Sequence, residues 1–247
     1  AYLLDGKLNN SFTAVNLLLE KGVKVSRIDN VKGFHPGDFL IAESDGSFLR
    51  TIAEETGVTF KAINVVPAGG MHELKKYRLG MFKRYYGGNM DEGWTRLVLE
   101  QHRFPYKSVF DPEFQKTDMI KNFDVIILPS DSPAMIKGVE PEKQDERYKS
   151  YPEKYRSGIG KKGVENLKRF VSDGGTLIAL ANSFEFVVQE FGLKVENDLA
   201  KESTKEFFCP GSTLRAKFDS FSPFAYGMPE EGLVLFNNSP VFRIGED

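Results

Sequence analysis

The residues with the clearest link to chemistry lie in segment 174–185, which reads Gly-Gly-Thr-Leu-Ile-Ala-Leu-Ala-Asn-Ser-Phe-Glu. A Gly-Gly turn precedes a short apolar run, which is typical of a strand buried on both faces of a parallel sheet. A helical pattern that Gly192 ends then follows, and its apolar residues fall at core spacing: Phe184, Val187, Val188 and Phe191. In many α/β hydrolytic enzymes this strand-to-helix elbow carries the nucleophile. Here the elbow residue is Ala181, so the segment predicts an enzyme scaffold without its nucleophile.

Neither a substitute nucleophile nor a metal motif is evident elsewhere. Class I amidotransferase chemistry needs a cysteine at the elbow and a histidine after a later strand, because an adjacent base generates the thiolate. The chain has three histidines, all before the elbow and in no zinc-binding pattern: His35, His72 and His102. Ser183 lacks the G-x-S-x-G turn of serine hydrolases. Serine is a preferred N-cap residue, so we expect Ser183 to cap the following helix.

A second group of polar residues lies in the first turn of a predicted helix, in the segment Met90–Arg96. One interpretation is structural: Asp91 caps the helix, Glu92 interacts with the helix dipole and Trp94 packs in the core. The other interpretation is a polar binding site formed by Asp91, Glu92 and Arg96. A glycine inside a helix costs roughly 1 kcal/mol, so Gly93 indicates close packing or the close approach of a ligand.

The elements that must position these residues alternate between strands and helices in two lobes. We expect a small α/β lobe over residues 1–68, with strands at 2–4, 23–25, 39–41 and 58–63. Segment 67–70, Pro-Ala-Gly-Gly, is the expected boundary. The domain at 76–247 is expected to have strands at 78–82, 106–109, 125–128 and 176–180, and antiparallel edge strands or extra strands at 214–218 and 233–236. This order predicts an α/β, flavodoxin-like, mostly parallel sheet with helices on both faces.

In such sheets ligands bind beyond the carboxyl ends of the strands, where the strand order reverses. The candidate ligand-binding residues all lie in loops or helix starts predicted at that edge: Asp91, Glu92, Trp94, Arg96, Ser130, Asn182, Ser183 and Glu185. Buried charges must be paired, so we expect Arg96 to pair with Glu92 or Glu185. The polar insertion 139–160 is long enough to fold over this site as a lid.

Composition excludes several classes of partner. A formal net charge of −2 indicates neither nucleic acid nor an anionic membrane as a partner. No apolar run approaches the ~18 residues that span a bilayer. The single Cys209 excludes an internal disulfide and a cysteine-rich zinc site, and fits a reducing compartment or a secreted bacterial protein. Ala1 opens directly into an apolar run, so we expect a fragment or a processed chain.

A family resemblance is carried by several patches of sequence. Residues 89–96 (Asn-Met-Asp-Glu-Gly-Trp-Thr-Arg), 99–101 and 104–106 resemble the C-terminal region of bacterial M14-type zinc carboxypeptidase-like proteins. Residues 12–18, 208–215 and 225–229 resemble further patches of that region. The resemblance implies a class I glutamine amidotransferase-like domain that follows a metallopeptidase domain in a larger exported protein. It implies an extracellular or periplasmic location, and it implies zinc only in the upstream domain, because the H-x-x-E motif is missing here.

Together these observations predict a non-catalytic accessory domain of an M14 carboxypeptidase-like protein, which contributes substrate positioning, ligand binding or interdomain contacts. Its expected partners are the upstream peptidase domain and a peptide or small polar ligand, and we expect no metal or cofactor in this chain. One alternative is a hydrolase that uses Asp91, Glu92 and Ser183 at the strand ends. Another is a structural oligomerisation domain, which predicts a dry apolar surface patch and no polar cleft.

Overall fold

A computed structural model describes residues 1–42, 45–116, 118–203, 205–237 and 239–245. The chain divides into two compact units. The first unit comprises Ala1–Lys76, Leu99–Phe104 and Gly211–Asn237, and the second comprises Tyr77–Val98, Pro105–Pro210 and Asn238–Asp247. The sequence pattern assigned residues 211–237 to the later domain, whereas their contacts group them with the first unit. Among the described residues, no helix is long and apolar enough to cross a membrane.

The first unit contains a five-stranded sheet of order β4-β1-β3-β2-β5, in which every pair of neighbours is antiparallel. Its strands are β1 (Tyr2–Leu4), β2 (Val25–Ile28), β3 (Phe39–Ile41), β4 (Lys61–Ala62) and β5 (Met71–Glu73). The helices α1 (Asn9–Glu20) and α2 (Gly46–Thr56) share a core with this sheet. Because β3 lies between β1 and β2, the α1 connection does not produce a parallel pair. Segment 67–70 connects β4 to β5 within the same sheet.

The strands expected near residues 214–218 and 233–236 form a hairpin of their own. Strands β11 (Ser212–Lys217) and β12 (Glu231–Phe236) make a two-stranded antiparallel sheet, so their prediction as additions to the parallel sheet was wrong. The connecting loop contains the 3₁₀ turn η3 (Pro223–Ala225). The Tyr226 hydroxyl donates to Asp29 Oδ1 over 3.1 Å, which attaches this loop to the first unit. Side chains on β12 remain open to solvent, including Leu233 at 72% and Leu235 at 73% exposure.

The second unit contains a parallel sheet of order β7-β6-β8-β9. Numbered within this unit, the order is 2-1-3-4, which is that of flavodoxin-like folds. Its strands are β6 (Leu79–Lys83), β7 (Tyr106–Phe110), β8 (Val125–Leu128) and β9 (Thr176–Ala179). All four strands lie within two residues of the predicted bounds and run parallel in one sheet. The prediction of an α/β, flavodoxin-like parallel sheet is therefore confirmed for this unit.

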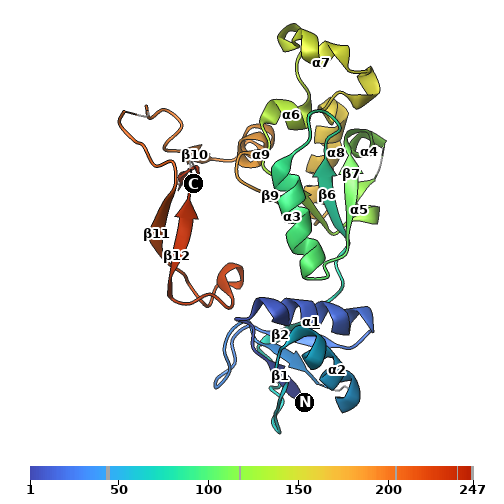
Figure 1. The fold of residues 1–247 in the computed structure, drawn as a ribbon, viewed down its shortest axis with the longest axis vertical. Coiled ribbons are helices and arrows are strands. Elements are labelled where there is room, and N and C mark those ends of the chain that lie inside the picture. The colour runs from blue at the N-terminus through green and yellow to red at the C-terminus, as the bar shows by residue number, and fades with distance from the viewer. Residues whose placement is uncertain (43–44, 117, 204, 238, 246–247) are drawn as a thin grey trace. The chain divides into compact units, whose positions relative to one another are not determined.

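Helices cover both faces of this sheet, as right-handed crossovers require when the strand order reverses. Figure 1 shows α3 (Met90–Gln101) on one side and α8 (Gly160–Ser172) on the other. The α8 side holds most of the core, with Leu167 and Phe170 packed among residues of β8, α4 (Asp111–Lys116) and α5 (Met119–Asn122). Helices α6 (Pro133–Lys137) and α9 (Ser183–Phe191) contact each other and contribute Ile136 and Phe186 to the same core.

Strand β9 departs from its predicted burial. It lies at the edge of the parallel sheet, and Ile178 is 40% exposed, so the expectation of a strand buried on both faces was wrong. The predicted core positions of α9 are only partly buried, and its fully buried apolar residue is Phe186. The physical reason is that no fifth parallel strand covers β9 in the described chain. The next strand, β10 (Val195–Asn197), instead pairs antiparallel with β13 (Phe242–Ile244).

Candidate functional site

The elbow after β9 has the backbone conformation of a nucleophile-bearing turn. Ala181 has φ +44°, and Arg103 is the other non-glycine residue with positive φ in the described chain. A left-handed conformation costs an L-residue roughly 1–2 kcal/mol, and such strain concentrates at functional turns. The backbone N–H of Leu180 donates to Leu128 O over 2.9 Å, which holds the elbow beside the end of β8. The strained turn is therefore present and exposed, with a methyl group where a nucleophile would stand.

Ser183 is fully buried, and its hydroxyl is used within the fold. Its Oγ donates to the carbonyl of Pro129 and accepts a hydrogen bond of 3.0 Å from the backbone N–H of Asp131. Asn182, without a side-chain bond, occupies the N-cap position of α9, so the prediction of Ser183 as the cap was wrong. The second unit also contains no histidine, since all three belong to the first unit. Ser183 thus joins the elbow to the loop after β8 and has no imidazole base from its own unit.

An ion pair between a buried carboxylate and a half-buried guanidinium lies at the carboxyl ends of the two central strands. Arg84 directly follows β6, and its Nε donates to Asp131 Oδ2 over 2.6 Å in the loop after β8. Arg84 also donates to the carbonyl of Tyr86. Asn89 Nδ2 donates to Asp131 Oδ2 over 3.2 Å and to the carbonyl of Ser130 over 3.0 Å. Neither Arg84 nor Asp131 was among the predicted site residues, although both follow strands that the sequence pattern identified.

The two acidic residues predicted at the start of α3 differ in burial: Asp91 is exposed and Glu92 is buried. Asn89 Oδ1 accepts from the backbone N–H of Glu92 over 3.1 Å, so Asn89 caps the helix while Asp91 is exposed. Glu92 is buried, and its Oε1 has no hydrogen-bond partner in the described chain. Arg96 Nη1 lies 3.7 Å from that oxygen, which is one of the two ion pairs that the sequence predicted. The Glu185 side chain is exposed.

Trp94 does not serve as a core residue. Its side chain is 65% exposed, and Glu92 is the one residue of α3 that is buried. The structural interpretation of Trp94 was therefore wrong, because the inward-facing position of this helix start is taken by a carboxylate.

Hydrogen bonds connect four of the eight predicted residues, Glu92, Ser130, Asn182 and Ser183, into one network. Ser183 Oγ contacts Asp131, Asp131 contacts Asn89, and Asn89 contacts the backbone of Glu92. The backbone N–H of Asn182 donates to Ser130 Oγ over 3.4 Å. Asp91, Trp94 and Glu185 lie on the exposed surface. The residues that sequence reasoning missed share one signal, a charged or amide side chain within a few positions of a strand end: Arg84, Asn89, Asp111 and Asp131.

Asp111 is the most unusual of these residues. It directly follows β7 and is 3% exposed, and neither of its carboxylate oxygens has a hydrogen-bond partner in the described part of the chain. Burial raises the pKa of Asp111 to about 6. Backbone N–H groups of Gly158 and Tyr85 and the charge of Arg84 act in the opposite direction without completing a hydrogen bond. Such a raised pKa at the carboxyl end of a parallel strand is typical of functional sites.

The insertion 139–160 lies against the loop that follows β6. It contains the turns η1 (Pro141–Lys143) and η2 (Glu153–Tyr155) and the short helix α7 (Glu146–Ser150). Its tyrosines contact that loop: the ring centroids of Tyr148 and Tyr151 are each 4.9 Å from that of Tyr86, and Tyr155 is 5.5 Å from Tyr85. The insertion therefore covers part of the strand-end region, which is where a lid was predicted.

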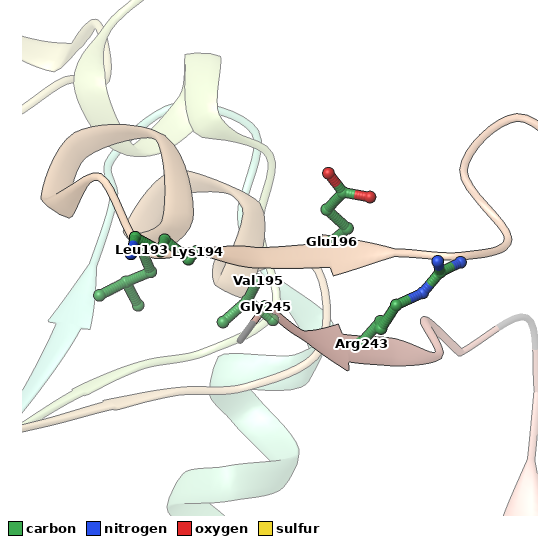
Figure 2. Close-up of a pocket in the computed structure, with 6 residues that line it drawn as sticks. All are labelled: Leu193, Lys194, Val195, Glu196, Arg243 and Gly245. Atoms are coloured by element: carbon green, nitrogen blue, oxygen red, sulfur yellow. The ribbon is translucent and has the colours of Figure 1, made fainter. Parts of the chain in front are cut away.

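A separate hollow of about 500 Å³ lies near the antiparallel pair β10–β13 and contains none of the predicted ligand-binding residues. Figure 2 shows Glu196 and Arg243 pointing outward from these neighbouring strands. Arg243 is already paired, with its Nη2 2.5 Å from Asp198 Oδ1. Among the residues that the structure describes, no group of three or more His, Cys, Asp or Glu side chains is arranged to hold a metal ion.

Comparison with known proteins identifies no family for this chain. No protein-family profile and no curated protein matches it. Among solved structures, a glutamine amidotransferase from Thermotoga maritima is similar with a TM-score of 0.41 and 10% identity, over 69% of this chain. The chain spans 64% of the length of that structure. The flavodoxin-like assignment therefore rests on the strand order and direction of the sheet itself.

Proposed function

We propose that the second unit is a non-catalytic ligand-binding domain of the class I amidotransferase-like kind, with its site at the carboxyl ends of β6, β7 and β8. The observation that carries the proposal is the elbow, which keeps the left-handed backbone of a nucleophile turn but bears Ala181. Beside it, the polar network of Arg84, Asn89 and Asp131 remains in place. Polar groups that converge at a strand-order reversal are the usual basis of a binding site.

The hydrolase alternative has less support. A serine nucleophile needs an accessible hydroxyl and a base within hydrogen-bond reach. The Ser183 hydroxyl is buried between Pro129 O and Asp131 N, and the unit supplies no histidine. Asp91 is exposed on the surface of α3, so it is not buried beside Ser183 as an acid or base.

The wider setting is proposed from sequence resemblance. The patches at 89–96 and 104–106 resemble M14 carboxypeptidase-like proteins, and we infer an accessory role beside an upstream zinc peptidase domain in an exported bacterial protein. The ligand would then be a peptide or a small polar molecule. The complete open reading frame tests this inference, since the accessory role fails if no zinc peptidase region is encoded upstream.

Turnover and binding assays on the purified chain test the central proposal. We expect no glutaminase or esterase turnover from the wild-type protein, and amide chemical shifts in a fragment screen that change around Arg84, Asn89 and Asp131. Robust turnover that is lost in Ser183→Ala or Glu92→Gln would establish the hydrolase instead. Ligand-induced shifts confined to residues 193–196 would move the binding site to the hollow beside β10.

A further inference from the structure

We propose that the Asp111 carboxylate anchors a site for an organic cation, an alkylammonium or alkylguanidinium group, beneath residues 139–157, which we call the cover. This inference rests on the proposed binding function and specifies the class of ligand. It is carried by the buried carboxylate without a described hydrogen-bond partner, by the charges around it and by the aromatic side chains of the cover.

Among the described residues, the Asp111 carboxylate has no hydrogen-bond partner of the kind that a buried carboxylate requires. Leaving an ionised carboxylate in the interior without hydrogen bonds costs several kcal/mol. Backbone N–H groups of Gly158, Asp111 and Tyr85 act on the carboxylate, but within the described chain neither oxygen has a partner at hydrogen-bond geometry, although the residue is almost completely buried. The nearby cation is Arg84, whose Nε is held by Asp131 at 2.6 Å. The fold thus holds a carboxylate in place without satisfying it.

At the strand ends, the cation that acts on Asp111 is shared with a second carboxylate. Across the order β7-β6-β8, the residues Asp111, Arg84 and Asp131 form an acidic, basic, acidic row. The Arg84 guanidinium acts on Asp111 and is already bound by Asp131. The other cations described near the cover act on aromatic residues: Arg156 on Tyr148, Lys83 on Phe110 and Lys154 on Tyr155. The further carboxylate of this region, Glu92, lies 3.7 Å from Arg96 on its own helix. A bound monocation beside Asp111 would give this carboxylate a counter-charge of its own, whereas an anion would be repelled by it.

The surroundings favour an organic cation over a metal ion. Tyr85 stacks on Phe110 with ring centroids 4.4 Å apart, and Tyr155 packs against the edge of Tyr85. Tyr86 is contacted by Tyr148, whose phenol interacts electrostatically with Asp111. Aromatic faces attract alkylammonium and guanidinium groups. Metal ions such as Ca²⁺ need six to eight oxygen ligands. Among the described residues, no cluster of three or more His, Cys, Asp or Glu side chains could hold such an ion.

The cover is a loop with a narrow base. Its two ends meet at Gly138 and Gly158, both with positive φ, and a Cβ on Gly158 would lie 2.4 Å from Gly138 Cα. The Ile159 N–H donates to Ile136 O over 2.9 Å and closes the base of the loop. The Tyr148 hydroxyl donates to Ser157 O over 2.8 Å within the cover. Residues 139–157 contribute no strand to the parallel sheet, so moving them to admit a ligand would break no strand pair.

The test uses the whole chain at pH 7 and four small probes: n-butylguanidinium, n-butylammonium, n-butanol and butyrate. Side-chain ¹³C NMR follows the ionisation of Asp111, and thermal unfolding follows binding in wild-type, Asp111→Asn and Asp173→Asn proteins. Asp173 is the control, an exposed carboxylate at the opposite end of β9. We expect the two cations to lower the Asp111 pKa by at least one unit. We expect them to raise the Tm of the wild-type and Asp173→Asn proteins but not that of Asp111→Asn.

Equal stabilisation of Asp111→Asn by the cations, or equal effects of n-butanol, would overturn the cation site. If butyrate or n-butanol perturbs the strand ends while the cations do not, the binding proposal stands and the cation site falls. If the chain proves catalytic while Asp111 responds to cations as expected, the non-catalytic proposal falls and the cation site stands. If no probe or fragment perturbs the strand ends, both proposals fall.

Discussion

The Nε atom of Arg84 lies 2.6 Å from Oδ2 of Asp131, and this ion pair connects the carboxyl end of β6 to the loop after β8. The same carboxylate accepts from Asn89, which caps α3. The pair therefore organises three segments around the proposed site. Removing one partner of this pair is expected to lower the free energy of unfolding more than removing both.

Replacing one member of this pair is expected to destabilise the fold strongly. Arg84→Met leaves Asp131 buried without its cation, and such a change typically costs about 3–5 kcal/mol. The double variant Arg84→Met/Asp131→Leu removes both charges and is expected to recover most of this loss. Urea unfolding measures the difference, with Lys162→Ala as the control, because it breaks an exposed pair with Glu165. A loss below about 1 kcal/mol in Arg84→Met would contradict the importance of the pair.

Removing the Ser183 hydroxyl is expected to weaken the link between the elbow and β8. Ser183→Ala leaves the Asp131 N–H and the Pro129 carbonyl without this buried partner, at a cost of about 1–3 kcal/mol. Ser172→Ala, at an exposed position in α8, is the matched control and is expected to change stability by less than about 0.5 kcal/mol. Chemical denaturation compares the two, and equal effects would show that the Ser183 bonds contribute nothing.

The positive φ of Ala181 predicts that glycine at this position is tolerated better than a larger residue. Ala181→Gly is expected to be neutral or stabilising by up to about 1 kcal/mol, because glycine adopts this conformation without strain. Ala181→Val is expected to be destabilising, because a β-branched residue disfavours positive φ. The control is Ala134→Gly in the exposed part of α6, where glycine is expected to cost about 1 kcal/mol. Melting curves that show the same sign for both glycine variants would contradict the strained elbow.

Restoring the nucleophile alone is expected to leave the chain inactive. Ala181→Cys would place a thiol on an exposed turn, yet the unit that carries it contains no histidine to form the thiolate. We expect the thiol to react with a disulfide reagent, as in an accessible cysteine, and glutaminase activity to stay at background. Measurable glutamine hydrolysis would show that a base of another kind faces the elbow.

The raised pKa of Asp111 predicts that this residue destabilises the protein at neutral pH. Its ordinary pKa is 3.8, and burial raises the folded value to about 6. Above pH 6 the carboxylate is charged in both states, and the full penalty applies, about 3 kcal/mol at 1.4 kcal/mol per unit. Below pH 4 the group is protonated in both states and the penalty vanishes. Asp111→Asn should therefore exceed the wild type in unfolding free energy at pH 8 and not at pH 3.5, and a pH-independent difference would contradict this assignment.

The glycine pair at the base of the cover predicts a selective effect on that loop. Gly158→Ala places a Cβ against the backbone of Gly138, so the two ends of residues 139–157 must separate. We expect faster tryptic cleavage within the cover, at sites such as Arg147 and Lys154. Gly174→Ala is the control, because Gly174 also has positive φ but no atom near its Cβ position. Equal cleavage in both variants would mean that backbone strain, and not the contact, governs the cover.

Local sequence pattern was sufficient for the four strands of the parallel sheet in the second unit. Apolar runs between turn signals placed β8 at its observed bounds and located the elbow at Ala181. The spacing of Glu92 and Arg96 on one helix was also sufficient for their ion pair. These features depend on neighbours in sequence, which the chain order reveals directly.

The arrangement between elements depended on the tertiary structure. Nothing local indicates that Asp111, Arg84 and Asp131 form one row, because their adjacency follows from the order β7-β6-β8. The exposure of Ile178 likewise depends on the missing neighbour of β9, and the hairpin β11–β12 depends on the pairing of distant segments. The sequence by itself therefore determined the strands of the parallel sheet and that the elbow lacks a nucleophile. Only the tertiary structure decided which charges meet, because strand order and burial arise from packing between segments far apart in the chain.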